Sequence, residues 1–516
     1  MSRSGKFFKG LVPTYGYQVM LVLTGIWLTP FYLRHIGQHD YGLWLVGTQF
    51  LTFLGLADFG VVALLPLETA SATGRAGGVE HAHDLPQVIG QTARLVLYQL
   101  PIVIAIAAVL WFTIPAGSQH LRGPLGIILL GFVVAFPLRM LPALLQGLQD
   151  LAFAATLGMV NWAITTAATI LMVLAGWNLF ALAVGWLISQ LLVTPVYMYR
   201  LWTRFPEVLP RRLPANDWIA ARTQLGKGIW VSVAQIAQLL MSNTDLLIIA
   251  KLLGPAAVVP YACTGKLPGV LANQAQILMQ TATPGLCELK AGGSREKLLH
   301  ALVALTNGLL TFSGLVFCVV LVVNRWFVTW WVTAGQYGGF WLTAAILLNM
   351  LFVHWDTAAA YSVFSLGHQR RISLTNMGNG IVTAVGALVL TMWLGPIGAP
   401  LGSLAGTCLV GLPFNLRIIA RDTGVRVFQL IRAMIGGWLW RFALVAAGTW
   451  WVATKWSPQS LPAAAAAAIS IAAVYSLVML PGLLSSPLAI YLRPLSVAFG
   501  RRQTAPVAVA EVVKEA

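Results

Sequence analysis

The segment SNTDLLIIAKLLG (residues 242–254) places Asp245 and Lys251 in one long apolar run that begins near Gly228. In lipid, a charged side chain near the centre of a helix costs about 2.5–3.5 kcal/mol on insertion scales. Residues of this kind usually have a partner, an aqueous cavity or a function. The segment therefore indicates a membrane helix that carries charge for a reason.

The composition of the whole chain agrees with this interpretation. Of 516 residues, 58% are hydrophobic and only 9% are charged, and the mean hydropathy is +0.79. Soluble globular domains average about 25% charged residues, so this class is excluded. A β-barrel would show segments of about ten residues with alternating polarity, and these runs are longer and continuously apolar. We expect an all-α polytopic membrane protein.

A spanning helix needs about 20 apolar residues. This template predicts about 14 transmembrane helices, near residues 11–33, 42–67, 93–115, 124–147, 152–175, 178–199, 227–251, 256–286, 299–323, 339–365, 372–394, 399–416, 433–454 and 461–484. The segment 256–286 is long, and its prolines (Pro260, Pro268 and Pro284) predict kinks.

The distribution of basic residues predicts the orientation. If the N-terminus is cytoplasmic, most of the 32 lysines and arginines fall in inward connections, and the external side keeps only Arg34, Arg122, Lys251, Arg325 and Lys455. We therefore expect a multi-pass protein of the bacterial cytoplasmic (inner) membrane with both termini in the cytoplasm. The net charge of +17 is then dispersed beside an anionic inner leaflet, and nucleic acid is not an expected partner.

Landmarks recur at a nearly constant separation and predict an internal repeat. Separations of 220 or 219 residues relate Tyr41 to Tyr261, Gly147 to Gly367, and Gly176 to Gly395. Six spans in each half make the repeat parallel, with substrate expected between the halves. The predicted parts are a six-helix lobe (1–199), a cytoplasmic linker with an interfacial helix (200–226), a second six-helix lobe (227–432), two extra C-terminal helices (433–484) and a cytoplasmic tail (485–516).

Two stretches resemble a known family. IGQHDYGLWLVGTQFLTFLGLADFG (36–60) is similar to the start of polysaccharide-unit flippases of the O-antigen type, and NTDLLIIAKLLGPAAVVPYACTGKL (243–267) is similar to the opening of their second lobe. This family belongs to the multidrug/oligosaccharidyl-lipid/polysaccharide exporter superfamily. The resemblance implies two lobes around a central cavity and alternating access. It also implies flipping of an undecaprenyl-diphosphate-linked oligosaccharide from the inner to the outer leaflet, with a polysaccharide polymerase and glycosyltransferases as further partners.

Five intramembrane charges are the candidate substrate-binding or coupling residues. Arg139 lies between Pro137 and Pro142, where it suits bidentate phosphate recognition, with an ion pair to Asp58 as the competing role. Asp245 and Lys266 lie on consecutive antiparallel helices, so an ion pair across that hairpin is one expectation and a face turned to water is the other.

The fifth candidate, Asp356, is expected to face the cavity, whereas His354 two residues earlier is expected to be an interior histidine. The four cysteines (Cys263, Cys287, Cys318 and Cys408) show no disulfide or metal-ligand spacing, so no metal or cofactor is expected. The tryptophans near the external ends of the spans, Trp326 and Trp330 among them, fit an aromatic belt rather than a ligand site.

Three other functions compete. A cation-coupled multidrug exporter of the same superfamily often uses a carboxylate in its first helix, and 11–33 contains none. A lipid II flippase shares the 14-span plan. A membrane glycosyltransferase or polymerase needs a sizeable external catalytic loop, and the longest expected external connection (324–339) has no carboxylate and one arginine. The sequence therefore favours a transporter and not an enzyme.

Overall fold

The computed structural model describes residues 3–75, 84–112, 122–210, 218–291 and 295–485, and within these ranges the chain is helical with no strand. It divides into two compact units, Met1–Leu239 and Leu240–Ala516. The boundary lies inside one helix, α9 (Trp218–Ser242). Trp218 and Arg222, which the sequence placed in an interfacial helix of the linker, belong to the first turns of α9, which continues to Ser242. The position of this segment at a membrane surface stays a prediction. The predicted tail (485–516) lies outside the described residues, apart from Ser485.

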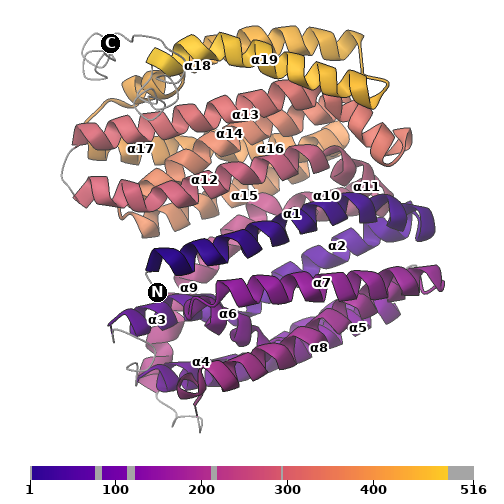
Figure 1. Cartoon of the computed structure of the whole chain (residues 1–516), viewed down its shortest axis with the longest axis vertical. Coiled ribbons are helices and arrows are strands. Elements are labelled where there is room, and N and C mark those ends of the chain that lie inside the picture. The colour runs from indigo at the N-terminus through magenta and orange to yellow at the C-terminus, as the bar shows by residue number, and fades with distance from the viewer. Residues whose placement is uncertain (1–2, 76–83, 113–121, 211–217, 292–294, 486–516) are drawn as a thin grey trace. The chain divides into compact units, whose positions relative to one another are not determined.

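The first unit consists of eight helices and the larger part of α9 (Figure 1). The eight helices are α1 (Arg3–His35), α2 (Gln38–Leu54), α3 (Val61–Arg75), α4 (Leu85–Phe112), α5 (Arg122–Ala135), α6 (Met140–Gly147), α7 (Leu151–Leu174) and α8 (Leu179–Arg204). Its core is an apolar cluster that includes Val61, Leu65, Leu85, Val96 and Phe136.

The second unit contains the remaining helices (Figure 1). They are α10 (Thr244–Leu253), α11 (Pro255–Thr264), α12 (Lys266–Ala291), α13 (Arg295–Trp331), α14 (Phe340–Ser365), α15 (Gln369–Leu394), α16 (Gly398–Gly406), α17 (Leu412–Thr423), α18 (Val427–Lys455) and α19 (Leu461–Ser485). The long helix α13 lies alongside α14 and α18. Its extent differs from expectation, because the helix continues through half of the predicted external connection (324–339) and leaves only residues 332–339 between α13 and α14.

Nine helical segments of the described chain are long and apolar enough to cross a membrane, and twelve if each of three bent pairs is one span. The predicted count of fourteen stays a prediction. It requires two spans in the 54-residue segment Arg370–Thr423 and one in α11–α12. Two spans in Arg370–Thr423 fit the geometry of α15 and α16, because these helices pack against each other and run in opposite directions.

Glycine permits that close approach. A Cβ atom on Gly398 would lie 2.2 Å from the carbonyl carbon of Leu390, and one on Gly402 would lie 2.1 Å from the nitrogen of Ala387. Gly395, at φ 64°, makes the turn between the two helices. The long expected span 256–286 is also interrupted, because α11 ends at Thr264 and α12 begins at Lys266.

Two of the repeat landmarks have matching local geometry. Gly37 (φ 90°, ψ 161°) and Gly254 (φ 90°, ψ 159°), which lie four and seven residues before the landmarks Tyr41 and Tyr261, each precede the first residue of a helix. Gly176 and Gly395 both have positive φ directly after a long helix. Left-handed backbone of this kind favours glycine, which explains the residue type at these turns. The third landmark pair does not match, because Gly147 is the last residue of α6 whereas Gly367 has φ 83°. The superposition of complete halves stays a prediction.

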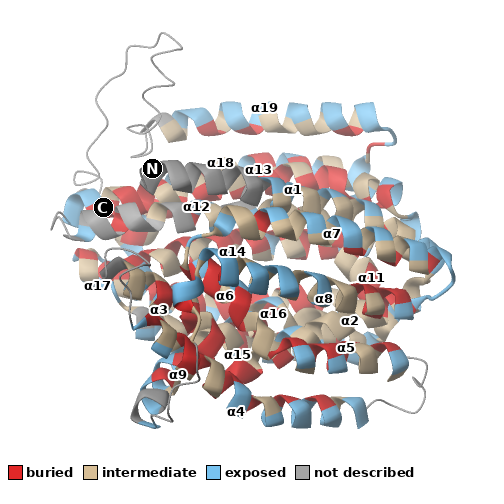
Figure 2. Cartoon of the chain, turned by 60° about the horizontal axis from the view of Figure 1, so that its bottom comes forward, coloured by how far each residue is buried: buried red, intermediate tan, exposed pale blue. Residues whose placement is uncertain are grey.

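Many large apolar side chains are exposed, as expected for helices that face lipid. On α19, Ile469 and Leu477 are exposed, and most of the helix is exposed or half-buried (Figure 2). The polar groups that are buried are therefore the unusual feature of this chain, and they are where a site is to be sought.

Candidate functional site

Two helix breaks meet in the first unit. The segments Gln38–Asp58 and Val61–Thr73 are bent by 58°, and Arg122–Ala135 and Pro137–Gly147 by 55°. At the first break Phe59 (φ 48°) and Gly60 (φ 70°) leave helical geometry, and at the second Pro137 removes a backbone donor. A break in a membrane helix frees backbone groups that need new partners.

Side chains supply these partners at the first break. Asp58 Oδ1 accepts a hydrogen bond of 2.9 Å from the backbone N–H of Gly60, and Gln99 Nε2 donates to the carbonyl of Asp58 at 3.0 Å. Arg139, from the second break, donates from Nη1 to the carbonyl of Gly55 at 3.1 Å. The sequence did not single out Gln99, because an amide in an apolar helix carries no charge that marks it.

Arg139 also forms the ion pair with Asp58 that the sequence offered as a competing role. Its Nη2 lies 3.7 Å from Asp58 Oδ2, and the exposed fractions of the two side chains are 36% and 2%. The guanidinium carbon lies 5.9 Å from the ring centre of Phe132 and 5.8 Å from that of Phe136. Because a guanidinium has five N–H donors and this one is more than one-third exposed, it can bind an anion while it contacts Asp58.

In the second unit Asp245 bonds to a tyrosine and not to the expected lysine. Tyr261 donates from its hydroxyl to Asp245 Oδ2 at 2.7 Å, and Asp245 Oδ1 is buried with no hydrogen-bond partner among the residues that the structure describes. Lys266 is the first residue of α12, and in the described part of the chain it forms no ion pair with Asp245. The expected ion pair of the hairpin is therefore replaced by a carboxylate–phenol contact.

Asp356 lies in a buried polar cluster built from α14, α15 and α17. Its Oδ1 accepts from Asn415 Nδ2 at 2.8 Å and its Oδ2 from Asn379 Nδ2 at 3.5 Å. Thr383 Oγ1 in turn donates to Asn379 Oδ1 at 3.2 Å. These partners are neutral, and Asn415 Oδ1 is itself buried with no partner in the described part of the chain.

A short π-helix, Thr407–Gly411, runs beside this cluster. A Cβ atom on Gly411 would lie 2.5 Å from Asp356 Oδ2, so only glycine lets the backbone come this close to the carboxylate. Single π-helical turns are frequent at functional sites. His354, in contrast, is buried with Nδ1 hydrogen-bonded to Ser313 Oγ, which fits the expected interior histidine.

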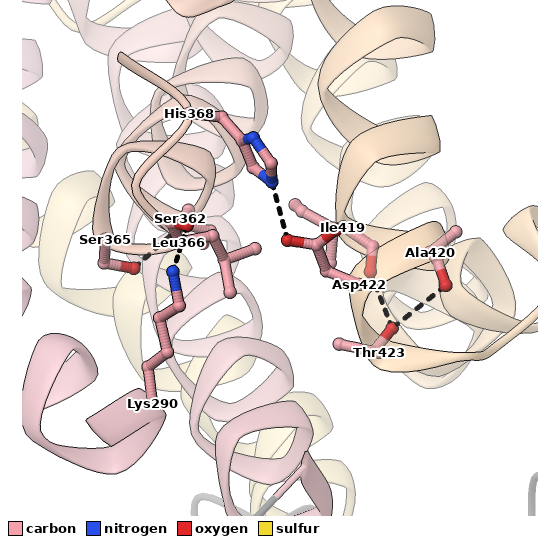
Figure 3. A network of polar contacts seen from close by, with 9 residues as sticks. All are labelled: Lys290, Ser362, Ser365, Leu366, His368, Ile419, Ala420, Asp422 and Thr423. Carbon is pink, nitrogen blue, oxygen red and sulfur yellow. Dashed lines mark hydrogen bonds and ion pairs between the residues drawn. The ribbon is translucent and has the colours of Figure 1, made fainter. Parts of the chain in front are cut away.

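A third group of polar residues lies around the connection between α14 and α15 (Figure 3). His368 Nε2 lies 2.7 Å from Asp422 Oδ2, and the ammonium of Lys290 donates to the carbonyl of Leu366. The contact of Lys290 joins α12 to the end of α14, and the contact of His368 joins the start of α15 to α17. The sequence did not predict this group, since charges near helix ends are common and no spacing relates residues from such distant segments.

A further polar group lies at the start of α9 in the first unit. Gln224 Nε2 donates to Thr92 Oγ1 at 2.6 Å and to Glu68 Oε2 at 3.3 Å, and Lys227 Nζ lies 3.7 Å from Glu68 Oε1. The three side chains of Glu68, Gln224 and Lys227 line a cavity of about 510 Å³, to which Asp84 adds a second carboxylate. Two carboxylates make this cavity unfavourable for a phosphate, and it is distinct from the Arg139 site.

Comparisons with known proteins agree with this fold. A family model described as "Polysaccharide biosynthesis protein" matches residues 52–334. The solved structure of the lipid II flippase MurJ in an inward closed conformation is similar over 94% of this chain and 99% of its own, with a TM-score of 0.63 and 10% identity. No curated protein matches the sequence.

Solved structures of multidrug transporters have a similar fold. An inward-facing multidrug resistance MATE family transporter of the MOP superfamily is similar over 81% of this chain and 98% of its own, with a TM-score of 0.57 and 13% identity. A MATE structure in complex with Br-NRF is similar over 80% of this chain and 95% of its own, with a TM-score of 0.53 and 13% identity. The likeness at these identities establishes the fold, and the family model confirms the resemblance seen in the sequence.

Proposed function

The chain belongs to the polysaccharide biosynthesis protein family, and from this premise we propose that it flips an undecaprenyl-diphosphate-linked oligosaccharide from the inner to the outer leaflet of the bacterial cytoplasmic membrane. Both termini would lie in the cytoplasm, and transport would proceed by alternating access. The chain would act as a transporter with no catalytic residue.

The observation that carries the proposal is the position of Arg139. An arginine in a membrane span is costly unless it has partners or water, and Arg139 has an incomplete set of partners and an exposed surface. Its planar fork matches the oxygens of a phosphate better than a lysine ammonium does. A diphosphate would bind to the donors that do not contact Gly55 and Asp58.

The carboxylates of the second unit suit a different role. Asp356 has only neutral hydrogen-bond partners, so a change of its charge is not compensated by a neighbouring cation. A buried carboxylate of this kind is suited to couple transport to an ion gradient. We assign Asp356 to coupling. The contact between Asp245 and Tyr261 is a second polar contact, which a conformational change would break. Lys266 is assigned as a residue that faces water or substrate.

The test is flipping of a fluorescent lipid-diphosphate oligosaccharide by purified protein in proteoliposomes. Arg139→Lys keeps the charge and loses the fork, so we expect at least a tenfold lower rate at normal expression. Arg441→Lys is the matched control, because Arg441 is a second arginine within a long apolar helix, where it donates to the carbonyl of Gly437 and stacks on Trp440. A wild-type rate for Arg139→Ala would remove Arg139 from the site.

Lipid II is the second candidate substrate, and the likeness to MurJ along almost the whole of both chains favours including it. Lipid II also carries a diphosphate, so Arg139 would serve either substrate. Competition between unlabelled lipid II and the labelled oligosaccharide in the same proteoliposomes separates the two. Inhibition by lipid II at lower concentrations than by the unlabelled oligosaccharide would reverse the assignment.

A further inference from the structure

One end of the second unit contains a hollow of about 510 Å³ that is built from three segments. The end of α13 supplies Arg325, Trp326, Thr329 and Trp330, the connection to α14 supplies Ala334 and Tyr337, and the connection between α18 and α19 supplies Ser457, Pro458 and Gln459. Small-molecule sites usually have volumes of about 300–1,000 Å³. The hollow is therefore large enough for a ligand of the size of a disaccharide.

Two stacked indoles form the apolar wall. Trp326 and Trp330 are one helical turn apart, with ring centres separated by 5.6 Å and planes at 13°. Trp330 is 61% exposed, so one large aromatic face is open to a ligand. The exposed face of an indole carries partial negative charge and attracts C–H groups that carry partial positive charge.

Hydrogen-bonding groups surround this wall. Ser457 and Gln459 lie on the connection between α18 and α19, and Arg325 and Thr329 lie beside the indoles on α13. Tyr337 is hydrogen-bonded through its hydroxyl to Thr343 Oγ1 at 3.3 Å, and a phenol can both donate and accept. Burial raises the pKa of Tyr337, although the hydrogen bond with Thr343 and the charge of Arg325 partly oppose this effect, so the phenol stays neutral and can donate.

A pyranose sugar fits this combination of groups. One face of the ring presents C–H groups, which stack on an aromatic face, and its rim presents hydroxyls that need donors and acceptors. The lining contains one cation, Arg325, and no carboxylate, which favours a sugar that carries an acid group.

We propose that this hollow is a saccharide site in which a sugar ring stacks on Trp330 and the carboxylate of an acidic sugar binds to Arg325. The inference goes beyond the proposed function, because a saccharide would bind here whether or not the chain flips it. An aromatic belt at the membrane surface accounts for exposed tryptophans, but it does not account for Ser457 and Gln459 on the wall of the same hollow.

The experiment measures binding and does not depend on transport. The full chain in nanodiscs is titrated with digalacturonic acid, and with the neutral disaccharide lactose, by calorimetry and by saturation-transfer NMR. We expect digalacturonic acid to bind more tightly, and Trp330→Ala to weaken binding of both sugars about fivefold to tenfold. Arg325→Gln should weaken only the acidic sugar, by about tenfold or more.

The matched control is Trp393→Ala, because Trp393 lies at the end of α15 and is 84% exposed. Trp330→Phe should retain most of the affinity, which separates loss of stacking from loss of folding. Absence of saccharide binding by the wild-type chain, or equal binding by Trp330→Ala and Trp393→Ala, would overturn the proposal and leave the indoles as belt residues.

Discussion

Arg139 Nη2 lies 3.7 Å from Asp58 Oδ2, and this ion pair joins the break between α5 and α6 to the break between α2 and α3. Asp58 has a second role at its own break, because its other oxygen accepts the N–H of Gly60. Asp58 therefore stabilises its own helix break and also pairs with Arg139, the residue that we assign to phosphate binding. Substitutions of Asp58 separate the hydrogen bond to Gly60 from the ion pair.

Asp58→Asn should keep the acceptor for Gly60 and lose the charge. We expect the free energy of unfolding to fall by about 1–2 kcal/mol, since Arg139 is partly exposed and water compensates part of the lost pairing. Asp58→Ala should cost about 1–3 kcal/mol more, because the buried N–H then also loses its partner. Thermal unfolding in detergent measures both. Equal losses for the two variants would show that the contact with Gly60 contributes nothing.

Tyr261 and Asp245 should show strong energetic coupling. Tyr261→Phe leaves the buried Asp245 without its hydrogen-bond donor, and we expect a loss of about 1–3 kcal/mol in stability. In the Asp245→Asn background the same change should cost less, and a double-mutant cycle gives the difference. The changes Asp245→Asn and Lys266→Met should be additive. Coupling between Asp245 and Lys266 as large as that with Tyr261 would contradict the structure.

The spacing of residues around Gly254 explains why Tyr261, and not Lys266, contacts Asp245. Asp245 precedes Gly254 by nine residues, Tyr261 follows it by seven and Lys266 by twelve. Tyr261 therefore lies closer than Lys266 to the distance of Asp245 from the turn. The sequence nevertheless predicts Lys266 as the partner, because only Lys266 carries the charge opposite to that of Asp245. The turn itself was predictable, because its geometry requires glycine at φ 90°.

Other contacts were not predictable because they join distant segments. The ion pair of Arg139 with Asp58 is an exception that the sequence offered as one of two alternatives, since both charges lie in apolar spans and need partners. Asn379 and Asn415 were not foreseen as partners of Asp356, because uncharged amides occur often and no period relates α14, α15 and α17. The length of α13 was also missed, since Arg325 and the tryptophans after it are typical of a membrane surface and do not end a helix.

Gln224 should contribute more to stability than Lys227, although both contact Glu68. Lys227 is 61% exposed, and ion pairs of this kind are worth about 0–1 kcal/mol. Gln224→Ala removes the contact with Thr92 in a buried position, so we expect a loss of about 1–3 kcal/mol. Urea or thermal unfolding of Gln224→Ala and Lys227→Ala compares the two. A larger loss for Lys227→Ala would show that the ion pair, and not the buried amide, holds the start of α9.

Asp356→Asn should preserve the fold and impair coupling. The amide keeps an acceptor for Asn415, so expression and thermal stability should stay close to those of the wild type. Flipping in proteoliposomes should then respond at least tenfold less to an imposed proton or sodium gradient. Gly411→Ala is the structural comparison, because its methyl group would meet Asp356 and lower stability. A wild-type gradient response of Asp356→Asn would remove this residue from coupling.

Cysteine labelling at the two ends of α13 tests the orientation. At 1.5 Å per residue, a helix of 37 residues is about 55 Å long and exceeds the hydrocarbon core of about 30 Å, so its ends should reach opposite surfaces. Glu296 and Gly335 are both exposed, and cysteines at these positions, in a chain whose native cysteines are replaced, are accessible to a reagent. In intact cells an impermeant maleimide should label Gly335→Cys, and label Glu296→Cys only after permeabilisation. Labelling of both from outside would contradict a spanning α13, whereas labelling of Glu296→Cys alone would reverse the orientation that the basic residues predict.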